Sequence, residues 1–173
     1  MNRFCAFSIV FFILAASCSS SPKTTRLKDI DLLETTDVMS GSLKSSLFFV
    51  ECANSKLPIR LSYQKAENQS SDMLRPAEQW MFVERVLDSA MIQTLKDSYD
   101  ITTIRAAEKI NRSTNRDVTH LMTAVVTTVT RDEYKDRTDA YRCQYEIINL
   151  QTGELVWSDG YEIKRVASGL SWD

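Results

Sequence analysis

The residue with the clearest chemistry is Cys18, which follows the apolar N-terminal stretch of the chain. A basic residue precedes an apolar run from residue 4 to residue 14, which is shorter than the ~20 residues needed to span a bilayer. Small residues at 15–17 (AAS) then precede the cysteine, as in a bacterial lipobox, with Leu14 one position earlier than the usual leucine. This pattern predicts a lipoprotein signal peptide over residues 1–17 and acylation of Cys18. The alternative is ordinary secretory cleavage at the same bond, which the same small residues also permit.

Residues 18–28 are expected to form a polar, lipid-anchored tether. Two or more acyl chains make such anchoring stable, because each buried methylene adds about 0.8 kcal/mol. Ser19 stands where many lipoproteins retained in the inner membrane carry an aspartate. The lipobox resemblance therefore implies the periplasmic face of the outer membrane of a Gram-negative bacterium, and the function is sought in the periplasm.

Two cysteines remain in the part of the chain that is expected to fold, Cys52 and Cys143. An oxidising periplasm permits a disulfide between them, but two isolated cysteines give no framework pattern. Cys143 occupies an inward position of an alternating strand, where a thiol behaves as a small apolar group. Two buried thiols are therefore favoured over a disulfide, which stays as the alternative.

His120 is the only histidine, so the chain cannot complete a Ser/His/Asp triad or a multi-histidine metal site. It lies beside Leu121 and Met122 in an expected strand, which favours a structural role. The sequence also lacks a glycine-rich phosphate loop, a pair of CxxC motifs and a GxSxG motif. We expect a protein that is not an enzyme and has no cofactor, metal or small-molecule substrate.

Two further groups of residues have a structural and a functional interpretation. Mixed charges surround an expected hairpin turn, which is typical of a solvated turn, the alternatives being a calcium site or a partner contact. Trp157, Tyr145 and Tyr161 could form a ligand platform, but their alternation along two strands favours packing in the core. The charged residues of the turn are Arg131, Asp132, Glu133, Lys135, Asp136 and Arg137.

Length and charge limit the class of protein. Removal of 17 residues from 173 leaves roughly 155, which is the size of one domain, predicted over residues 29–173. The chain has 21 Lys and Arg against 23 Asp and Glu, a net charge of −2, so nucleic acid is not an expected partner.

Hydrophobic periodicity predicts the elements that position these residues. Apolar positions recur at helical spacing from Asp29 to about Leu47 and from Pro76 to about Lys96, and a short helix is expected at 105–111. Alternation predicts strands at 57–63, 99–104, 119–131, 138–150 and 154–165, with a polar loop at 67–72. Gly153 is placed where a hairpin turn needs a positive φ. The expected fold is α+β, with a mostly antiparallel sheet of about five strands, a C-terminal three-strand meander and helices packed on the sheet.

The C-terminal third resembles the LpoB family of lipoproteins, which activate penicillin-binding proteins. The resemblance rests on residues 141–150 (YRCQYEIINL), 151–159 (QTGELVWSD) and 161–165 (YEIKR), which are similar to the family's last hairpin. Related folds in curli-secretion and flagellar outer-membrane lipoproteins share this hairpin pattern, so it indicates a superfamily as well.

The resemblance implies a non-catalytic lipoprotein that binds and activates a class A penicillin-binding protein, a bifunctional peptidoglycan synthase. The alternative is a structural lipoprotein of an outer-membrane assembly, curli-secretion-like or flagellar-like. The tether of this chain is ten residues beyond the cysteine, and at most about 35 Å long. Contact with an inner-membrane synthase would then depend on that enzyme extending toward the outer membrane.

Overall fold

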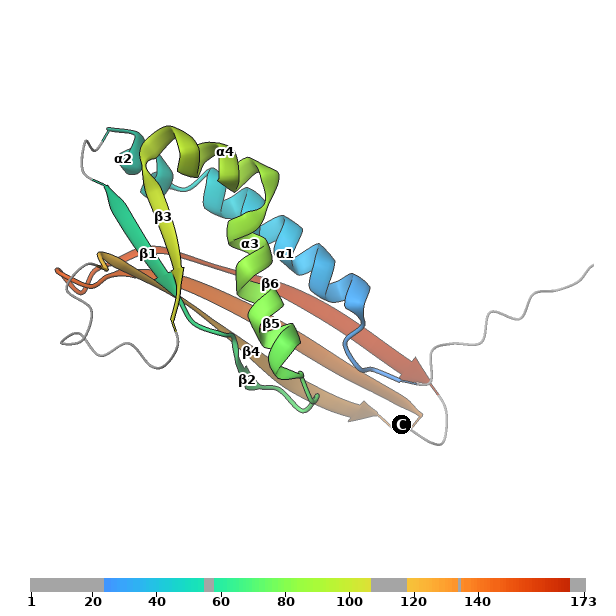
Figure 1. Cartoon of the computed structure of the whole chain (residues 1–173). Helices are drawn as coiled ribbons and strands as arrows, with labels where there is room; N and C mark the ends of the chain where they lie inside the picture. The colour runs from blue at the N-terminus through green and yellow to red at the C-terminus, as the bar shows by residue number, and fades with distance from the viewer. Residues whose placement is uncertain (1–23, 55–57, 107–117, 134, 169–173) are drawn as a thin grey trace, which may run out of the picture.

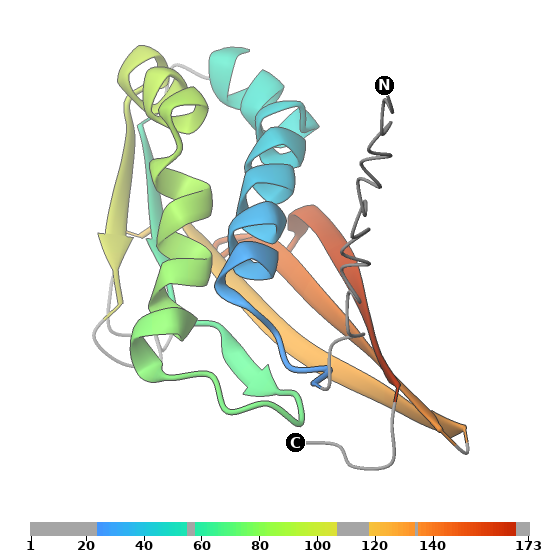
Figure 2. The same cartoon turned by 90° about the vertical axis from the view of Figure 1, so that its right-hand side faces the viewer.

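A twisted mixed sheet carries all four described helices on one of its faces, in a computed structural model that describes residues 24–54, 58–106, 118–133 and 135–168 (Figures 1 and 2). The strand order is β3-β1-β4-β5-β6, and β2 pairs with β4 beside β1. The strands are β1 (Ile59–Tyr63), β2 (Glu67–Gln69), β3 (Ile101–Arg105), β4 (His120–Glu133), β5 (Asp136–Asn149) and β6 (Leu155–Ser168). The helices are α1 (Asp29–Lys44), α2 (Leu47–Asn54), α3 (Pro76–Asp88) and α4 (Ala90–Tyr99).

The predicted C-terminal meander is present as β4, β5 and β6, which pair antiparallel over almost their full lengths. Inward positions alternate strictly along β5, where Tyr141, Cys143, Tyr145 and Ile147 are all buried. The turn between β5 and β6 contains Gly153 at φ 77°, as its position in the sequence predicted.

The sheet is mostly antiparallel, as predicted, through the long pairings of β4, β5 and β6. The pairings of β1 and β2 are parallel, which the sequence did not predict. β1 pairs parallel with both β3 and β4, and β2 also pairs parallel with β4. β1 and β2 follow one another along the same side of β4, so the expected polar loop at 67–72 contains a short strand. The sequence did not predict β2, because Glu, Asn and Gln show no apolar alternation. β2 pairs with the part of β4 that continues past β1.

Of the two long helices predicted from sequence, the first is followed by a short helix, α2, that was not predicted, and the second is divided in two. The first ends at Lys44, and α2 begins at Leu47 after two serines whose hydroxyls bond to carbonyls of the preceding turn. The second divides at Ser89, whose side chain accepts a hydrogen bond from the Ile92 N–H at 3.3 Å and so caps α4. The apolar stripe continues across the division at Ser89, which is why periodicity alone joins α3 and α4.

The core lies between the helices and the inward face of the sheet. Its largest fully buried side chains include Tyr145, Phe82, Met39 and Met122, contributed by strands and helices alike. The expected helix at 105–111 is wrong at its first residue, because Arg105 ends β3, and its remaining positions from 107 lie outside the described residues. No helix in the described ranges is both long enough and apolar enough to cross a membrane.

Candidate functional site

The chain between the predicted anchor and the first helix is built into the domain. Thr25, in the expected tether, is 5% exposed, and its hydroxyl donates a hydrogen bond to the carboxylate of Asp139 on β5. Arg137 donates from Nε to the same carboxylate oxygen at 3.1 Å. The last five residues of the expected tether, 24–28, are therefore attached to the sheet, and the folded domain begins before the predicted boundary at residue 29.

A second contact fixes the same N-terminal segment at Leu27. The backbone N–H of Leu27 donates to Oδ2 of Asp72 at 2.7 Å, in the loop between β2 and α3. The hydroxyl of Tyr141 donates to the same oxygen at 2.9 Å. Asp72 thus joins the N-terminal segment to the centre of β5.

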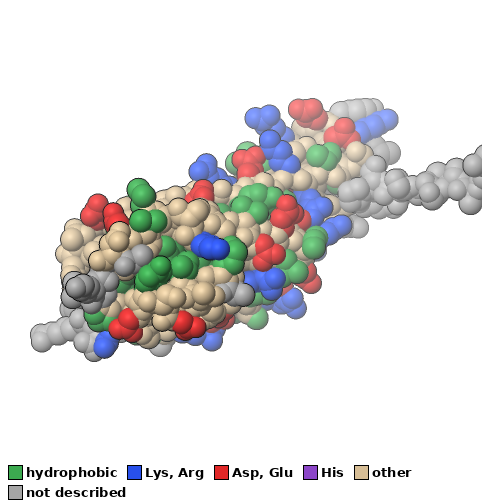
Figure 3. Space-filling model, turned by 90° about the horizontal axis from the view of Figure 1, so that it is seen from above, with side chains coloured by type: hydrophobic (Ala, Val, Ile, Leu, Met, Phe, Trp, Pro, Cys, Tyr) green, Lys and Arg blue, Asp and Glu red, His purple; other side chains and the backbone are tan. Residues whose placement is uncertain are grey.

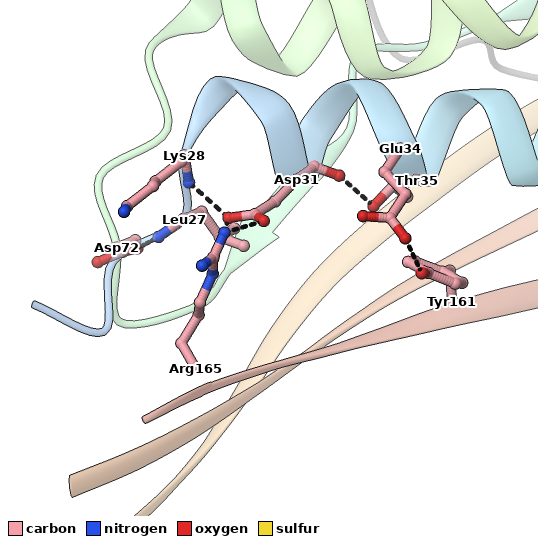
Figure 4. A network of polar contacts seen from close by, with 8 residues as sticks. All are labelled: Leu27, Lys28, Asp31, Glu34, Thr35, Asp72, Tyr161 and Arg165. Carbon is pink, nitrogen blue, oxygen red and sulfur yellow. Dashed lines mark hydrogen bonds and ion pairs between the residues drawn. The ribbon is translucent and has the colours of Figure 1, made fainter. Parts of the chain in front are cut away.

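The start of α1 is held to β6 by a part-buried ion pair between Asp31 and Arg165 (Figure 4). Asp31 is 4% exposed, and its carboxylate accepts from the backbone N–H of Lys28 at 2.8 Å and from Arg165 Nε at 3.0 Å. One turn further along, the Tyr161 hydroxyl donates to Glu34 at 2.6 Å. We call the contacts made by Thr25, Leu27, Lys28, Asp31, Asp72, Asp139, Tyr141 and Arg165 the clasp.

The clasp contains ionisable side chains that are buried away from solvent, among them Asp139 and Tyr141. Burial raises the pKa of Asp139, but hydrogen bonds from Thr130 and Thr25 and the nearby Arg137 guanidinium outweigh burial and hold that pKa below its ordinary value. Burial and the hydrogen bond to Asp72 raise the pKa of Tyr141, so its hydroxyl stays protonated and can donate. The arrangement can hold a chain end firmly, and it offers no activated nucleophile.

The charged turn between β4 and β5 projects beyond the helices. Strand pairing continues to Glu133 and Asp136, so the turn is shorter than predicted. Its described charged side chains are exposed, apart from half-buried Arg137. No cluster of metal-ligating side chains occurs in the described residues. The solvated-turn interpretation is consistent with this exposure.

His120 lies at the opposite end of the sheet, in a cavity of about 280 Å³. Its Nδ1 is 2.8 Å from the Thr119 hydroxyl, its ring contacts Phe48 edge-on, and burial lowers its pKa, which keeps the ring neutral at pH 7. Glu51 and Glu154 also line the cavity, and Glu154 belongs to the turn between β5 and β6. The contacts of His120 with its neighbours fit the expected structural role.

The two cysteines of the domain are buried free thiols. Cys52 lies on α2 and is 3% exposed, whereas Cys143 lies on β5 and is 1% exposed. Burial raises the pKa of each thiol to about 12, so neither is a reactive nucleophile at neutral pH. The disulfide considered from the sequence is not formed in this structure.

The aromatic residues pack as the core interpretation predicted. Tyr145 is fully buried, Trp157 is 7% exposed, and their ring centroids are 6.4 Å apart. Tyr161 is half-buried, with its hydroxyl bound to Glu34. These residues join β5 and β6 to the helices and leave no open aromatic platform.

An apolar surface lies on the helix side of the molecule, where Figure 3 shows hydrophobic side chains around a basic residue. The helices carry four exposed apolar side chains, Val38 on α1, Leu47 and Val50 on α2, and Met91 on α4. The Lys44 ammonium lies 3.7 Å from the Met91 sulfur beside it.

Cys18, the lipidation site predicted from the sequence, lies outside the described residues, so its acylation stays a prediction. The clasp was missed, because its partners are 114 residues apart for Thr25 and Asp139 and 134 apart for Asp31 and Arg165. The one available signal was the aspartate Asp31 in the first turn of a helix, which by itself names no partner.

No family model and no curated protein matches the chain. It is similar to solved structures of the LpoB C-terminal domain from Salmonella enterica (12% identity, TM-score 0.49) and Escherichia coli (14% identity, TM-score 0.48), each alignment covering 77% of this chain and 98% of the other. It is also similar to lipoprotein GNA1162 from Neisseria meningitidis, at 12% identity over 63% of this chain and 84% of that one, with a TM-score of 0.41. At such identities and TM-scores these likenesses carry no information about partner or activity, and family membership stays a prediction.

Proposed function

We propose that the protein is a non-catalytic outer-membrane lipoprotein, anchored through Cys18, that binds and activates a class A penicillin-binding protein. Activation by such a regulator consists of favouring one conformation of the synthase, and it needs no chemistry of the regulator's own. The signal-peptide pattern and the resemblance of the C-terminal residues support this proposal.

The observation that carries the proposal is that the resembling residues form one structural unit. Residues 141–165 build paired β5 and β6, with the turn glycine in the left-handed conformation. Tyr145 and Trp157 face the core, while the turn itself is exposed at the end of the sheet away from the clasp. This is the hairpin that the resemblance implies, and it supports the proposal.

The packed residues 24–28 shorten the anchor, which restricts where a partner can be met. Six peptide steps separate Cys18 from Thr24, and an extended chain of that length spans about 21 Å. A synthase of the inner membrane must therefore extend toward the outer membrane to reach the domain.

The test is in-cell crosslinking of the tagged full-length lipoprotein, followed by capture and mass spectrometry. We expect recovery of a class A penicillin-binding protein, and faster glycan polymerisation by that purified synthase when the lipoprotein is added. A Cys18→Ala variant is the matched control, because it removes the acyl site and leaves the domain intact.

Two results would contradict the proposal. One is capture of the lipoprotein alone or of outer-membrane assembly proteins, with the synthases detectable in the lysate, which would favour the structural alternative. The other is crosslinking to a synthase whose rate is unchanged by the purified lipoprotein.

A further inference from the structure

We propose that the clasped end of the domain docks on the lipid headgroups of the leaflet that holds the acyl chains. The opposite end, with α2 and the turn between β5 and β6, then faces away from that membrane. This inference rests on the proposed acylation of Cys18 and adds to it a defined membrane-binding surface.

Chain length provides the first argument. The segment between Cys18 and Thr24 reaches no more than about 21 Å. Thr25 is bound to Asp139, which lies three residues from the end of β5. Strands of 14 residues are about 46 Å long, so the clasped end lies near the membrane and the other end can be far from it.

Exposed apolar side chains at the clasped end provide the second argument. Met73 is 92% exposed and follows Asp72, which binds the Leu27 N–H. Ile30, in the first turn of α1, is 62% exposed. These side chains lie on segments that the clasp fixes beside the point where the tether leaves.

The strands expose further apolar side chains at the same end of the molecule, on the opposite face of the sheet, away from the helices, so the rim of this end is apolar on both sides. Val129 on β4 is 65% exposed and Val166 on β6 is 50% exposed. Lys164 lies in the same cross-strand row as Val129, and Arg131 lies in the same row as Val166. We define the membrane-side surface as Ile30, Met73, Val129, Arg131, Lys164 and Val166.

Apolar side chains beside Lys and Arg are suited to the boundary between headgroups and acyl chains. The apolar groups enter the boundary, while the long side chain of Arg131 extends to lipid phosphates. Lys164 is paired with Glu162 at 3.4 Å, and the turn at this end also exposes Asp132, Glu133 and Asp136, so the charge of the surface is mixed. Each contribution is small, but the anchor supplies affinity and the surface has only to select one orientation. A membrane explains the position of these residues because the tether holds this end close to the lipid.

The test uses the full-length acylated protein in vesicles of phosphatidylethanolamine and phosphatidylglycerol, with an environment-sensitive fluorophore on one introduced cysteine. The labelled positions are Met73→Cys and Val129→Cys, with Thr152→Cys at the opposite end as the matched control. Cys52 and Cys143 are buried and do not compete for the label. We expect spin-labelled headgroups to quench the probes at 73 and 129 at least threefold more than the probe at 152.

A second measurement separates docking from simple proximity. Met73→Asp should lower the quenching of a probe at 129 at least twofold, whereas Leu47→Asp, an equally exposed apolar position on α2, should leave it unchanged. Both side chains are exposed, at 92% and 75%, so neither change disturbs the core.

Equal quenching at 73, 129 and 152 would show a domain lying flat or tumbling, and would overturn the inference. Stronger quenching at 152 would reverse the orientation and also overturn it. The readout contains no synthase, so its failure on vesicle-bound protein is distinct from a failure to capture a partner. Absence of acyl mass on Cys18 would overturn the anchoring on which both proposals rest.

Discussion

Asp31 is a buried carboxylate whose charge is paired with Arg165, 134 residues away in the chain. Arg165→Met removes the cation and leaves the carboxylate buried at 4% exposure. We expect the free energy of unfolding to fall by about 2–3 kcal/mol, because an unpaired buried charge keeps its desolvation cost. Urea unfolding of the purified domain measures this loss.

The matched control is the neighbouring position on the same strand. Lys164 pairs with Glu162 at 3.4 Å on the solvent side, with side chains 70% and 52% exposed. Lys164→Met should change stability by less than about 0.5 kcal/mol, because such pairs are screened by water. Equal losses for the two variants would contradict the role assigned to Arg165.

Asp139 gives the domain a specific sensitivity to acid. Its folded-state pKa lies below the ordinary value, so its ionised form stabilises the fold above the unfolded pKa of about 3.9. This stabilisation is lost as the pH falls through the lower, folded-state pKa. The stability difference between wild type and Asp139→Asn should be full at pH 5–7 and should shrink below about pH 4 in urea unfolding curves. A difference that stays constant down to pH 2 would contradict this.

The elements of the fold were partly predictable. The meander could be predicted because apolar and polar residues alternate over many positions in each of its long strands. The division at Ser89 and the end of α1 at Ser45 could not, because a serine that caps a helix and one inside a helix look alike in a periodic pattern. β2 was missed for another reason. It forms because β4 continues past β1 and leaves an unpaired edge there, and this edge exists only once β1 and β4 have paired.

Two glycines test how the elements use backbone freedom. Gly41 lies inside α1, and a Cβ built there meets no atom within 4 Å, so Gly41→Ala should raise the unfolding free energy by about 0.5–1 kcal/mol. Gly153 has φ 77°, so Gly153→Ala should lower it by about 1 kcal/mol. Thermal unfolding by circular dichroism measures both, and a shift of the same sign in the two variants would contradict the assignment.

At the scale of the whole molecule, the N-terminal segment is part of the folded unit. A chain beginning at Asp29 loses the hydrogen bonds of Thr25 and Leu27 to the carboxylates of Asp139 and Asp72. We expect it to be less stable than a chain beginning at Thr24 by about 3 kcal/mol, because hydrogen bonds to charged groups contribute about 1.5–3 kcal/mol each. Chemical denaturation of the two soluble chains compares them, and equal stabilities would place the clasp outside the folded unit.

The candidate site shows where sequence reasoning stops. Local signals were enough to find Cys18 and the turn at Gly153, since each depends on residues next to it. The clasp joins an N-terminal segment, a loop and two C-terminal strands, so its partners become neighbours only after the sheet has formed. The tether was predicted as 18–28 because its composition is polar, and composition does not reveal that Thr25 is buried.

The clasp sets an upper limit on how far the domain can reach from its anchor. From the row of Asp139 to Asn149 at the far end of β5 there are ten residues, or about 33 Å, and the anchor adds about 21 Å. On the proposed anchoring, the exposed turn at the far end stands no more than about 55 Å from the leaflet that holds the lipid. A partner rooted in the opposite membrane is then engaged only where the envelope is narrow enough for the two to meet, so binding would depend on the local distance between the membranes.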